Sequence, residues 1–172
     1  DIFLLIYLMD FKTRLANAYS TGWLIDDLYV IVKAIKRSQA IELATSDELG
    51  RLPLHWAVIY NSPAIIISQL LKVYPYAAKV PDGDGNLALH LAAWSRAQVP
   101  TIQMLLKVNS AASITENFFG DVPIRLASMR SASDDALLLL FFSYERINDD
   151  PDRAFPDYTT KRTIQTLEER HF

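Results

Sequence analysis

Two histidines, His55 and His90, are the first residues whose type and spacing could do chemistry. They stand 35 residues apart, and a pair of imidazoles is able to bind a metal ion or transfer protons. The next position at the same spacing holds Arg125, and no third ligand keeps the interval. We therefore expect each histidine to hydrogen-bond the backbone between neighbouring turns, and we expect no metal site.

The run from Asp82 to Asn86 alternates acidic residues with glycine, as the opening of a calcium-binding loop does. Such a loop also needs a glycine at its sixth position and a glutamate at its twelfth. The chain has Leu87 and Ala93 at those places. Glycine and aspartate also favour tight turns, so this run predicts a turn.

The remaining sequence offers no arrangement typical of an active site. It contains no glycine-rich phosphate loop, no nucleophile elbow and no paired-histidine zinc motif. Cysteine is absent, which removes thiol catalysis, disulfides and cysteine-bound metals. The adjacent acids at 26–27, 149–150 and 168–169 are typical of solvated faces and loops. We expect a protein that is not an enzyme and uses no cofactor.

Composition narrows the class of partner. Hydrophobic residues make up 51% of the 172 positions and charged residues 22%, which excludes a disordered chain. The formal net charge of −3 leaves no basic surplus for a phosphate backbone, so nucleic acid is not expected as a partner. Without cysteine or a glycosylation acceptor, the chain is expected inside the cell, in the cytoplasm or an organelle, and not secreted.

The first residues form an apolar run from Ile2 to Met9. It is far shorter than the roughly 18 residues that a membrane-spanning helix needs. A helix that is apolar all round is normally buried on every side. We expect this run to contact another subunit or the edge of a membrane complex. Because the chain begins with Asp1, we also expect a fragment or a processed form, with Met9 as an alternative start.

The elements that carry these residues repeat along the chain. The phrase Leu52-Pro53-Leu54-His55-Trp56-Ala57 returns as 87–92 and again as 122–127, with an offset of 35 both times. A glycine precedes each copy by two residues, and an aspartate or asparagine by five. A fixed period of roughly 20 to 50 residues is the signature of stacked repeats.

This phrase, followed by a second apolar segment ending in two large hydrophobic residues, resembles the ankyrin repeat. That family opens its first helix with Thr-Pro-Leu-His and has a period of about 33 residues. Here the threonine is replaced by Leu52, Leu87 and Val122. The resemblance covers residues 45–146. It implies an all-α fold, an ankyrin-repeat α-solenoid of stacked helix-turn-helix pairs joined by turn tips.

We expect three regions. Residues 1–44 are predicted to hold two helices (2–19 and about 23–38) that form a degenerate N-terminal cap repeat. Residues 45–146 are predicted to be three repeats, with first helices near 53–60, 88–96 and 123–131 and second helices near 63–73, 100–108 and 134–146. Residues 147–172 are predicted to be a loop and a helix from about 159, either a C-terminal cap or a tail that binds a partner.

Two details follow from these boundaries. Ser62 and Ser133 are expected to cap the second helices that follow them. First helices of about nine residues are too short to be stable alone, so they must be held by stacking on neighbouring repeats. The stacking residues are expected to be Leu54, Ala57, Leu89, Ala92, Ile124 and Ala127.

The resemblance also implies a binding face, because ankyrin stacks hold partners on the concave surface formed by turn tips and first helices. The repeat register places there Leu49, Arg51, Tyr60, Asn86, Trp94, Phe118, Phe119, Met129 and Arg130. Aromatic residues, methionine and arginine are enriched in interface cores. We therefore expect a protein partner on the concave face.

The expected function is a protein–protein interaction module without catalysis. Two versions are open: a scaffold or adaptor that docks transient partners, and a structural subunit of a larger assembly. The alternative is a regulatory ankyrin domain of a longer, partly missing chain, which could include an enzymatic part.

Overall fold

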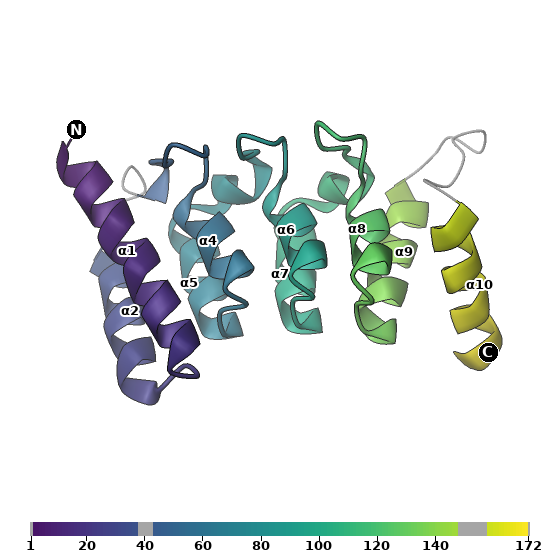
Figure 1. Cartoon of the computed structure of the whole chain (residues 1–172), viewed down its shortest axis with the longest axis horizontal. Coiled ribbons are helices and arrows are strands. Elements are labelled where there is room, and N and C mark those ends of the chain that lie inside the picture. Colours follow the sequence, from purple (N-terminus) through teal and green to yellow (C-terminus); the bar gives the residue numbers. More distant parts are fainter. Residues whose placement is uncertain (1, 38–42, 148–157, 172) are drawn as a thin grey trace.

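The computed structural model describes residues 2–37, 43–147 and 158–171, and within them the regular elements are all helices. The helices stand in pairs, side by side in one row, with the two termini at opposite ends (Figure 1). The pairs are α1 (Ile2–Ser20) with α2 (Ile25–Arg37), α4 (Pro53–Ile59) with α5 (Ala64–Val73), α6 (Ala88–Trp94) with α7 (Val99–Val108), and α8 (Pro123–Met129) with α9 (Asp134–Ile147). Helix α10 (Tyr158–His171) closes the row.

The expected all-α solenoid is confirmed. Helices α4, α6 and α8 line one face of the row, and the turns that precede them project along one edge (Figure 1). We call these turns the tips; they comprise residues 45–52, 80–87 and 115–122. Among the described helices, none is both long enough and apolar enough to cross a membrane.

The first helices are shorter than the sequence predicts, with seven residues each. Each is stopped by a residue in the left-handed conformation two positions later, at Asn61, Arg96 and Ser131, which are one repeat apart. The amide that follows closes the turn, as Ser62 N does on the Ala57 carbonyl at 2.9 Å. Gly22, after α1, has the same left-handed conformation, so the first helix pair is joined by a similar turn.

The second helices begin near the predicted positions, with two corrections. Ser62 does not cap α5: its hydroxyl is buried and has no hydrogen-bond partner among the described residues. Helix α7 begins at Val99, one residue early, because Pro100 is tolerated within the first turn. Ser133 does lie at the start of α9, where its hydroxyl accepts a hydrogen bond from the Ala136 amide at 3.4 Å.

Short 3-10 turns follow the second helices of the first two repeats. These turns are η1 (Pro75–Lys79) and η2 (Ser110–Ile114), which the sequence analysis did not predict. Ala77, Ala78 and Ala112 within them are buried. Asn109 donates from Nδ2 to the Ala78 carbonyl at 3.0 Å. Both turns are thus packed parts of the stack.

The core confirms the predicted stacking residues. Ala57, Ala92 and Ala127 have no exposed surface, so neighbouring first helices approach closely over their small side chains. The larger stacking residues, Leu54, Leu89 and Ile124, are equally buried. Burial of a side chain of this size stabilises the fold by about 1.5–3 kcal/mol, which offsets the weakness of seven-residue helices.

At the two ends, helices cover the outermost repeats. Helix α1 packs on α4 and α2 packs on α5, while α10 packs on α8 and α9 with Ile164 and Leu167 buried. The side chains of residues 2–9 and the segment 148–157 lie outside the described residues. The functional division into 1–44, 45–146 and 147–172 therefore stays a prediction.

Glycine is required at the tips for two separate reasons. Gly50 and Gly85 have φ values of +69° and +79°, a region that other residues enter at a cost. A methyl group on Gly50 would lie 2.8 Å from the Gly83 amide nitrogen, and one on Gly85 would lie 2.9 Å from the Phe118 amide nitrogen. Gly120 shares the conformation, with φ of +75°, but a methyl group there meets nothing within 4 Å.

This difference predicts an ordered series of stabilities. Gly120→Ala should lower the free energy of unfolding by about 1 kcal/mol, the cost of the left-handed conformation alone. Gly50→Ala and Gly85→Ala should cost roughly 2–4 kcal/mol, because the next tip must also move. Thermal melting followed by circular dichroism measures the order. Equal losses in all three variants would contradict the tip contacts described here.

Candidate functional site

Each tip is folded around one side-chain oxygen. Asp82 accepts hydrogen bonds at Oδ1 from the amides of Asp84 (3.0 Å) and Asn86 (2.8 Å). Asp47 does the same one repeat earlier, and Asn117 one repeat later. The aspartate-glycine run that resembles a calcium loop is therefore a turn, as predicted. Within the described residues no cluster of three or more potential ligands could hold a metal ion.

Neighbouring tips are joined to one another by hydrogen bonds. The Gly83 amide donates to the Leu49 carbonyl at 2.8 Å, and the Phe118 amide donates to the Asp84 carbonyl at 3.1 Å. Side chains repeat the connection, since Asn117 donates from Nδ2 to Asn86 Oδ1 at 2.8 Å. One repeat earlier, Arg51 Nε lies 3.3 Å from Asp82 Oδ2. The tips therefore form one continuous edge.

The two histidines fasten each tip to the next, which confirms the backbone role predicted for them. His55 accepts a hydrogen bond at Nδ1 from the Leu52 amide (3.0 Å) and donates from Nε2 to the Val80 carbonyl (3.1 Å). His90 accepts from the Leu87 amide and lies with Nε2 against two carbonyls of the following tip. This pattern requires the neutral ring with its hydrogen on Nε2.

Both rings are buried without exposed surface, and burial lowers the pKa of each. For His55 the pKa falls from 6.5 to about 4, and the nearby Asp82 opposes the fall only in part. Burial also lowers the pKa of His90, although hydrogen bonds to carbonyls raise it slightly. Neither histidine is free to bind a ligand or to exchange a proton with one.

Below the tips, a groove of about 570 Å³ runs across the first helices of the three repeats. Its lining follows the repeat register. Arg51, Asn86 and Asp121 are one such set, Ile59, Trp94 and Met129 a second, Leu91 and Leu126 a third, and Asp84 and Phe119 a fourth. His90 and Asn117 complete the lining. The groove is thus a direct product of stacking similar units.

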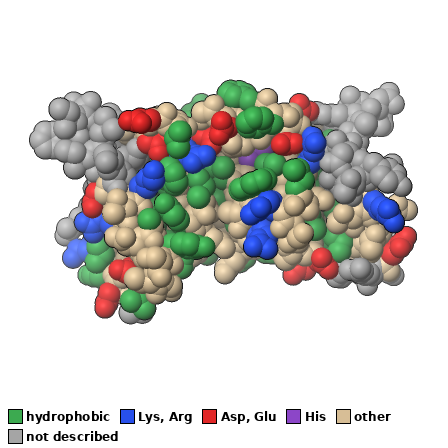
Figure 2. Space-filling view, in the orientation of Figure 1, with side chains coloured by type: hydrophobic (Ala, Val, Ile, Leu, Met, Phe, Trp, Pro, Cys, Tyr) green, Lys and Arg blue, Asp and Glu red, His purple; other side chains and the backbone are tan. Residues whose placement is uncertain are grey.

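The most exposed part of the groove is aromatic and apolar. Trp94 is 46% exposed, Met129 61% and Phe119 70%. Arg130 holds its guanidinium carbon 4.5 Å from the centre of the Trp94 ring, and its Nε donates to the Trp94 carbonyl. Figure 2 looks onto this face and shows hydrophobic side chains gathered across it below an edge where acidic side chains stand.

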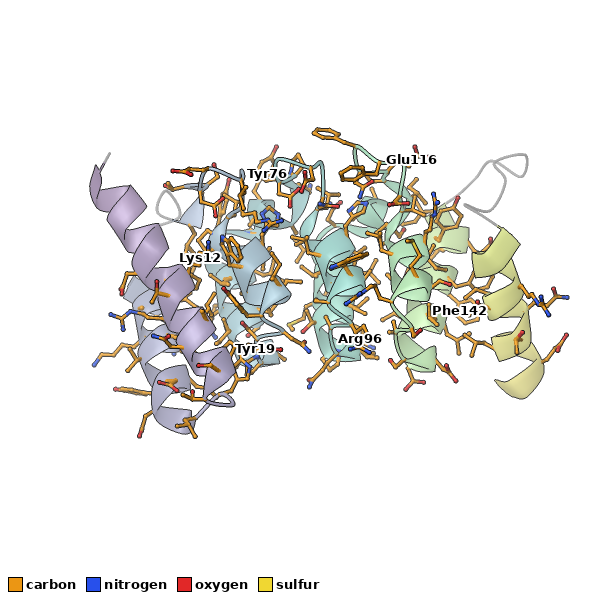
Figure 3. All side chains as sticks on the ribbon, viewed as in Figure 1. Lys12, Tyr19, Tyr76, Arg96, Glu116 and Phe142 are labelled. Carbon is orange, nitrogen blue, oxygen red and sulfur yellow. The ribbon has the colours of Figure 1, made fainter. Side chains whose placement is uncertain are left out.

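A second set of aromatic residues, which we call the α1–α4 cluster, lies beside the groove. Trp56 and Tyr60 stack with ring centres 5.8 Å apart, and Tyr19 of α1 lies 5.9 Å from Tyr60. Lys12 Nζ is 3.9 Å above the Trp56 ring. Figure 3 shows Lys12 and Tyr19 on the side of α1 toward α4. This cluster joins the first helix pair to the repeats.

The structure brings five of the nine predicted partner-binding residues together in the groove. These are Arg51, Asn86, Trp94, Phe119 and Met129. Arg130 lies directly beside them on Trp94. The other three lie elsewhere: Tyr60 belongs to the α1–α4 cluster, and Leu49 and Phe118 are exposed on the tips outside the groove lining.

Three groove residues were missed in the sequence analysis although the repeat register identifies them. Ile59 stands one period before Trp94, and Leu91 and Leu126 are one period apart within the repeated phrase. Leu91 and Leu126 are buried and also line the groove. The α1–α4 cluster carries no such signal, because Lys12 and Tyr19 precede the repeats.

The groove is suited to binding, since a large apolar surface beside oriented polar groups is what protein interfaces use. Its one histidine, His90, is committed to the backbone. Its two carboxylates are those of Asp84, which is exposed, and Asp121, which pairs with Arg125. Cation–π contacts such as the one between Arg130 and Trp94 contribute roughly 0.5–1 kcal/mol at exposed sites, which favours this position of the ring.

Comparison with known protein families gives a direct match. A model of three ankyrin repeats matches residues 26–118, more than half of the chain. The chain belongs to the ankyrin repeat family, whose members are generally protein–protein interaction modules and typically non-catalytic. A search of curated proteins finds no match. The family match begins at α2, earlier than the resemblance read from the sequence, and ends before α8.

The buried histidines predict a loss of stability in mild acid. Unfolded His55 takes up a proton near pH 6.5, whereas the folded ring does so only near pH 4. The unfolded state therefore binds more protons in between, so the stability present above pH 6.5 is lost as the pH falls. From pH 7 to pH 5 His55 alone should cost about 2 kcal/mol, and His90 acts in the same direction.

Urea unfolding at several pH values measures this loss. In a double variant carrying His55→Gln and His90→Gln the loss between pH 7 and pH 5 should nearly vanish, although that variant starts less stable. An unchanged pH dependence in the double variant would show that other groups control the acid response.

The exposure of the tip aromatics predicts that replacing them hardly changes the stability of the fold. Phe118 and Phe119 are 77% and 70% exposed, so changing both to serine should alter the free energy of unfolding by no more than about 0.5 kcal/mol. The matched core variant Ile124→Ser, at a buried position, should lower the melting temperature by several degrees. A similar drop in the tip variant would place these phenylalanines in the core.

Proposed function

We propose that this protein binds a partner protein in the groove formed by α4, α6 and α8, as a non-catalytic scaffold or adaptor or as a structural subunit of a larger assembly. The observation that carries the proposal is the juxtaposition of Trp94, Phe119 and Met129, three large exposed side chains from two repeats, over one groove. Tryptophan in particular is enriched among the residues that dominate binding energy.

The rigidity of the site supports the same proposal. The tips are hydrogen-bonded to one another, and Arg130 is held on the Trp94 ring. The backbone that carries the site is therefore held before a partner docks, which lowers the conformational cost of association. A preformed surface of this kind suits recognition by shape and area.

The two ends of the row have a supporting role in this proposal. We propose that residues 1–44 and α10 cap the stack, because each covers the outward side of a terminal repeat. The apolar segment 2–9 is proposed to contact another subunit or the edge of a membrane complex. The proposed location is inside the cell, in the cytoplasm or an organelle.

Capture from an extract of the native source tests the groove. The wild-type protein is compared with a double variant carrying Trp94→Ser and Met129→Ser, and with Tyr29→Ser as a matched control. Tyr29 is 65% exposed on α2 and is not part of the groove lining. Quantitative mass spectrometry should find at least one protein held by the wild type and the control but reduced about tenfold or more in the double variant.

The same proteins recovered equally on all three baits would exclude the groove as the binding surface. The melting temperature of each bait must match that of the wild type, so that unfolding does not mimic lost binding. The size of the native protein then separates the two versions of the function. Migration near 19.5 kDa indicates a free adaptor, and comigration with a large complex indicates a resident subunit.

A further inference from the structure

The tips form an acidic edge above the groove. The three tip segments (45–52, 80–87 and 115–122) carry six carboxylates and a single arginine. Figure 2 shows acidic side chains along this edge, above the hydrophobic face. Figure 3 shows Glu116 on the tip that leads into α8, whereas Arg96 lies at the end of α6 away from the tips.

Most of the tip carboxylates near the groove already have partners. Asp47 accepts a hydrogen bond from the Trp56 indole at 2.8 Å. Asp82 pairs with Arg51, and Asp121 lies 3.0 Å from Arg125. These three groups are held within the stack, so a bound protein gains little by approaching them.

Asp84 differs from these three. It lines the groove and its side chain is exposed. No ion pair with any described residue involves its carboxylate. Its own backbone is fixed, because its amide donates to Asp82 and its carbonyl accepts from the Phe118 amide. Among the described residues, Asp84 thus presents a carboxylate without an ion pair, on a fixed backbone, in the same groove lining as Trp94, Phe119 and Met129.

We propose that the groove binds a segment of a partner protein that carries one large apolar side chain next to a lysine or arginine. The apolar side chain lies among Trp94, Phe119 and Met129, and the cation pairs with Asp84. This inference rests on the proposed function, since it names the chemistry of the partner that the groove accepts.

The charges of the tips exclude the other occupants on physical grounds. An acidic segment would meet the exposed carboxylate of Asp84 in the groove lining, and juxtaposed like charges across an interface are unfavourable. A phosphate backbone is repelled for the same reason. A second copy of this chain, with a net charge of −3, would have to bring two acidic edges together if the grooves faced each other.

Selection from random dodecapeptides displayed on phage tests the chemistry without a known partner. Peptides are selected on the wild-type protein after removal of those that bind the Trp94→Ser, Met129→Ser double variant. The enriched peptides should share an aromatic or long aliphatic residue with lysine or arginine within a few positions. Enriched peptides that are acidic, or that lack the apolar residue, would overturn the proposal.

Charge reversal at Asp84 makes the test specific. Fluorescein-labelled copies of the enriched peptides should bind Asp84→Lys at least about tenfold more weakly than wild type, measured by fluorescence anisotropy. Asp84→Asn should give a smaller loss and a weaker dependence on salt. The matched control Glu145→Lys makes the same charge change at an exposed position on α9 and should change the affinity by less than about twofold.

The remaining outcomes also test which occupant the groove binds. An unchanged affinity in Asp84→Lys would remove the proposed ion pair, and selection that yields no peptide above the double-variant background would overturn the proposal for this groove. Sedimentation showing a dimer that the Trp94→Ser change dissolves would instead assign the groove to a second copy. The capture experiment stands apart from these results: partner loss in the double variant supports the groove even when the basic-peptide proposal fails.

Discussion

The hydrogen bonds that pass from one tip to the next are the interaction on which the rest of this structure depends. A tip has too few residues to satisfy its own backbone groups, and the helix that follows it has only seven, well below the roughly 12–15 that are marginally stable alone. The next tip supplies the missing partners. Its Gly83 or Phe118 amide donates to the Leu49 or Asp84 carbonyl of the preceding tip, and its carbonyls accept from the buried histidine of the preceding repeat. Each unit is therefore complete only beside its neighbour.

The same dependence produces the groove. Because successive units are nearly equivalent, side chains at the same position of each repeat lie in rows across the face, and the groove lining consists largely of these rows. The size and shape of the side chains in a row vary with the sequence, as in the row formed by Ile59, Trp94 and Met129. Stacking thus sets where the binding surface lies, and the individual substitutions set what that surface can recognise.

Much of this arrangement could be predicted from the sequence, because the 35-residue period is a property of the chain itself. The repeated phrase located the first helices and the backbone role of His55, and the repeat register identified five residues of the groove lining. The contacts that could not be predicted are those that do not recur from repeat to repeat. The pairing of Lys12 with Trp56 joins a segment outside the repeats to one inside them. The position of Asp84 in the groove, without an ion pair to any described residue, also depends on which neighbouring carboxylates have partners.

The residues at which the first helices end could not be predicted from local sequence either. Asn61, Arg96 and Ser131 adopt a left-handed conformation that only asparagine among them favours. Local propensity alone would extend the helices through Arg96, as the sequence prediction did. The turn is imposed because the second helix must fold back on the first, and the stacked core outweighs a local cost of about 1–2 kcal/mol.

A row of units that contact only their neighbours also has a distinctive way of coming apart. In such arrays stability is close to a sum of unit and interface contributions, so the end units open most readily and the centre last. The groove draws on α4, α6 and α8, and α1 and α10 stand outside these helices at either end. Brief fraying of the terminal helices would therefore leave the groove intact, and the ends can exchange with solvent while the centre stays engaged.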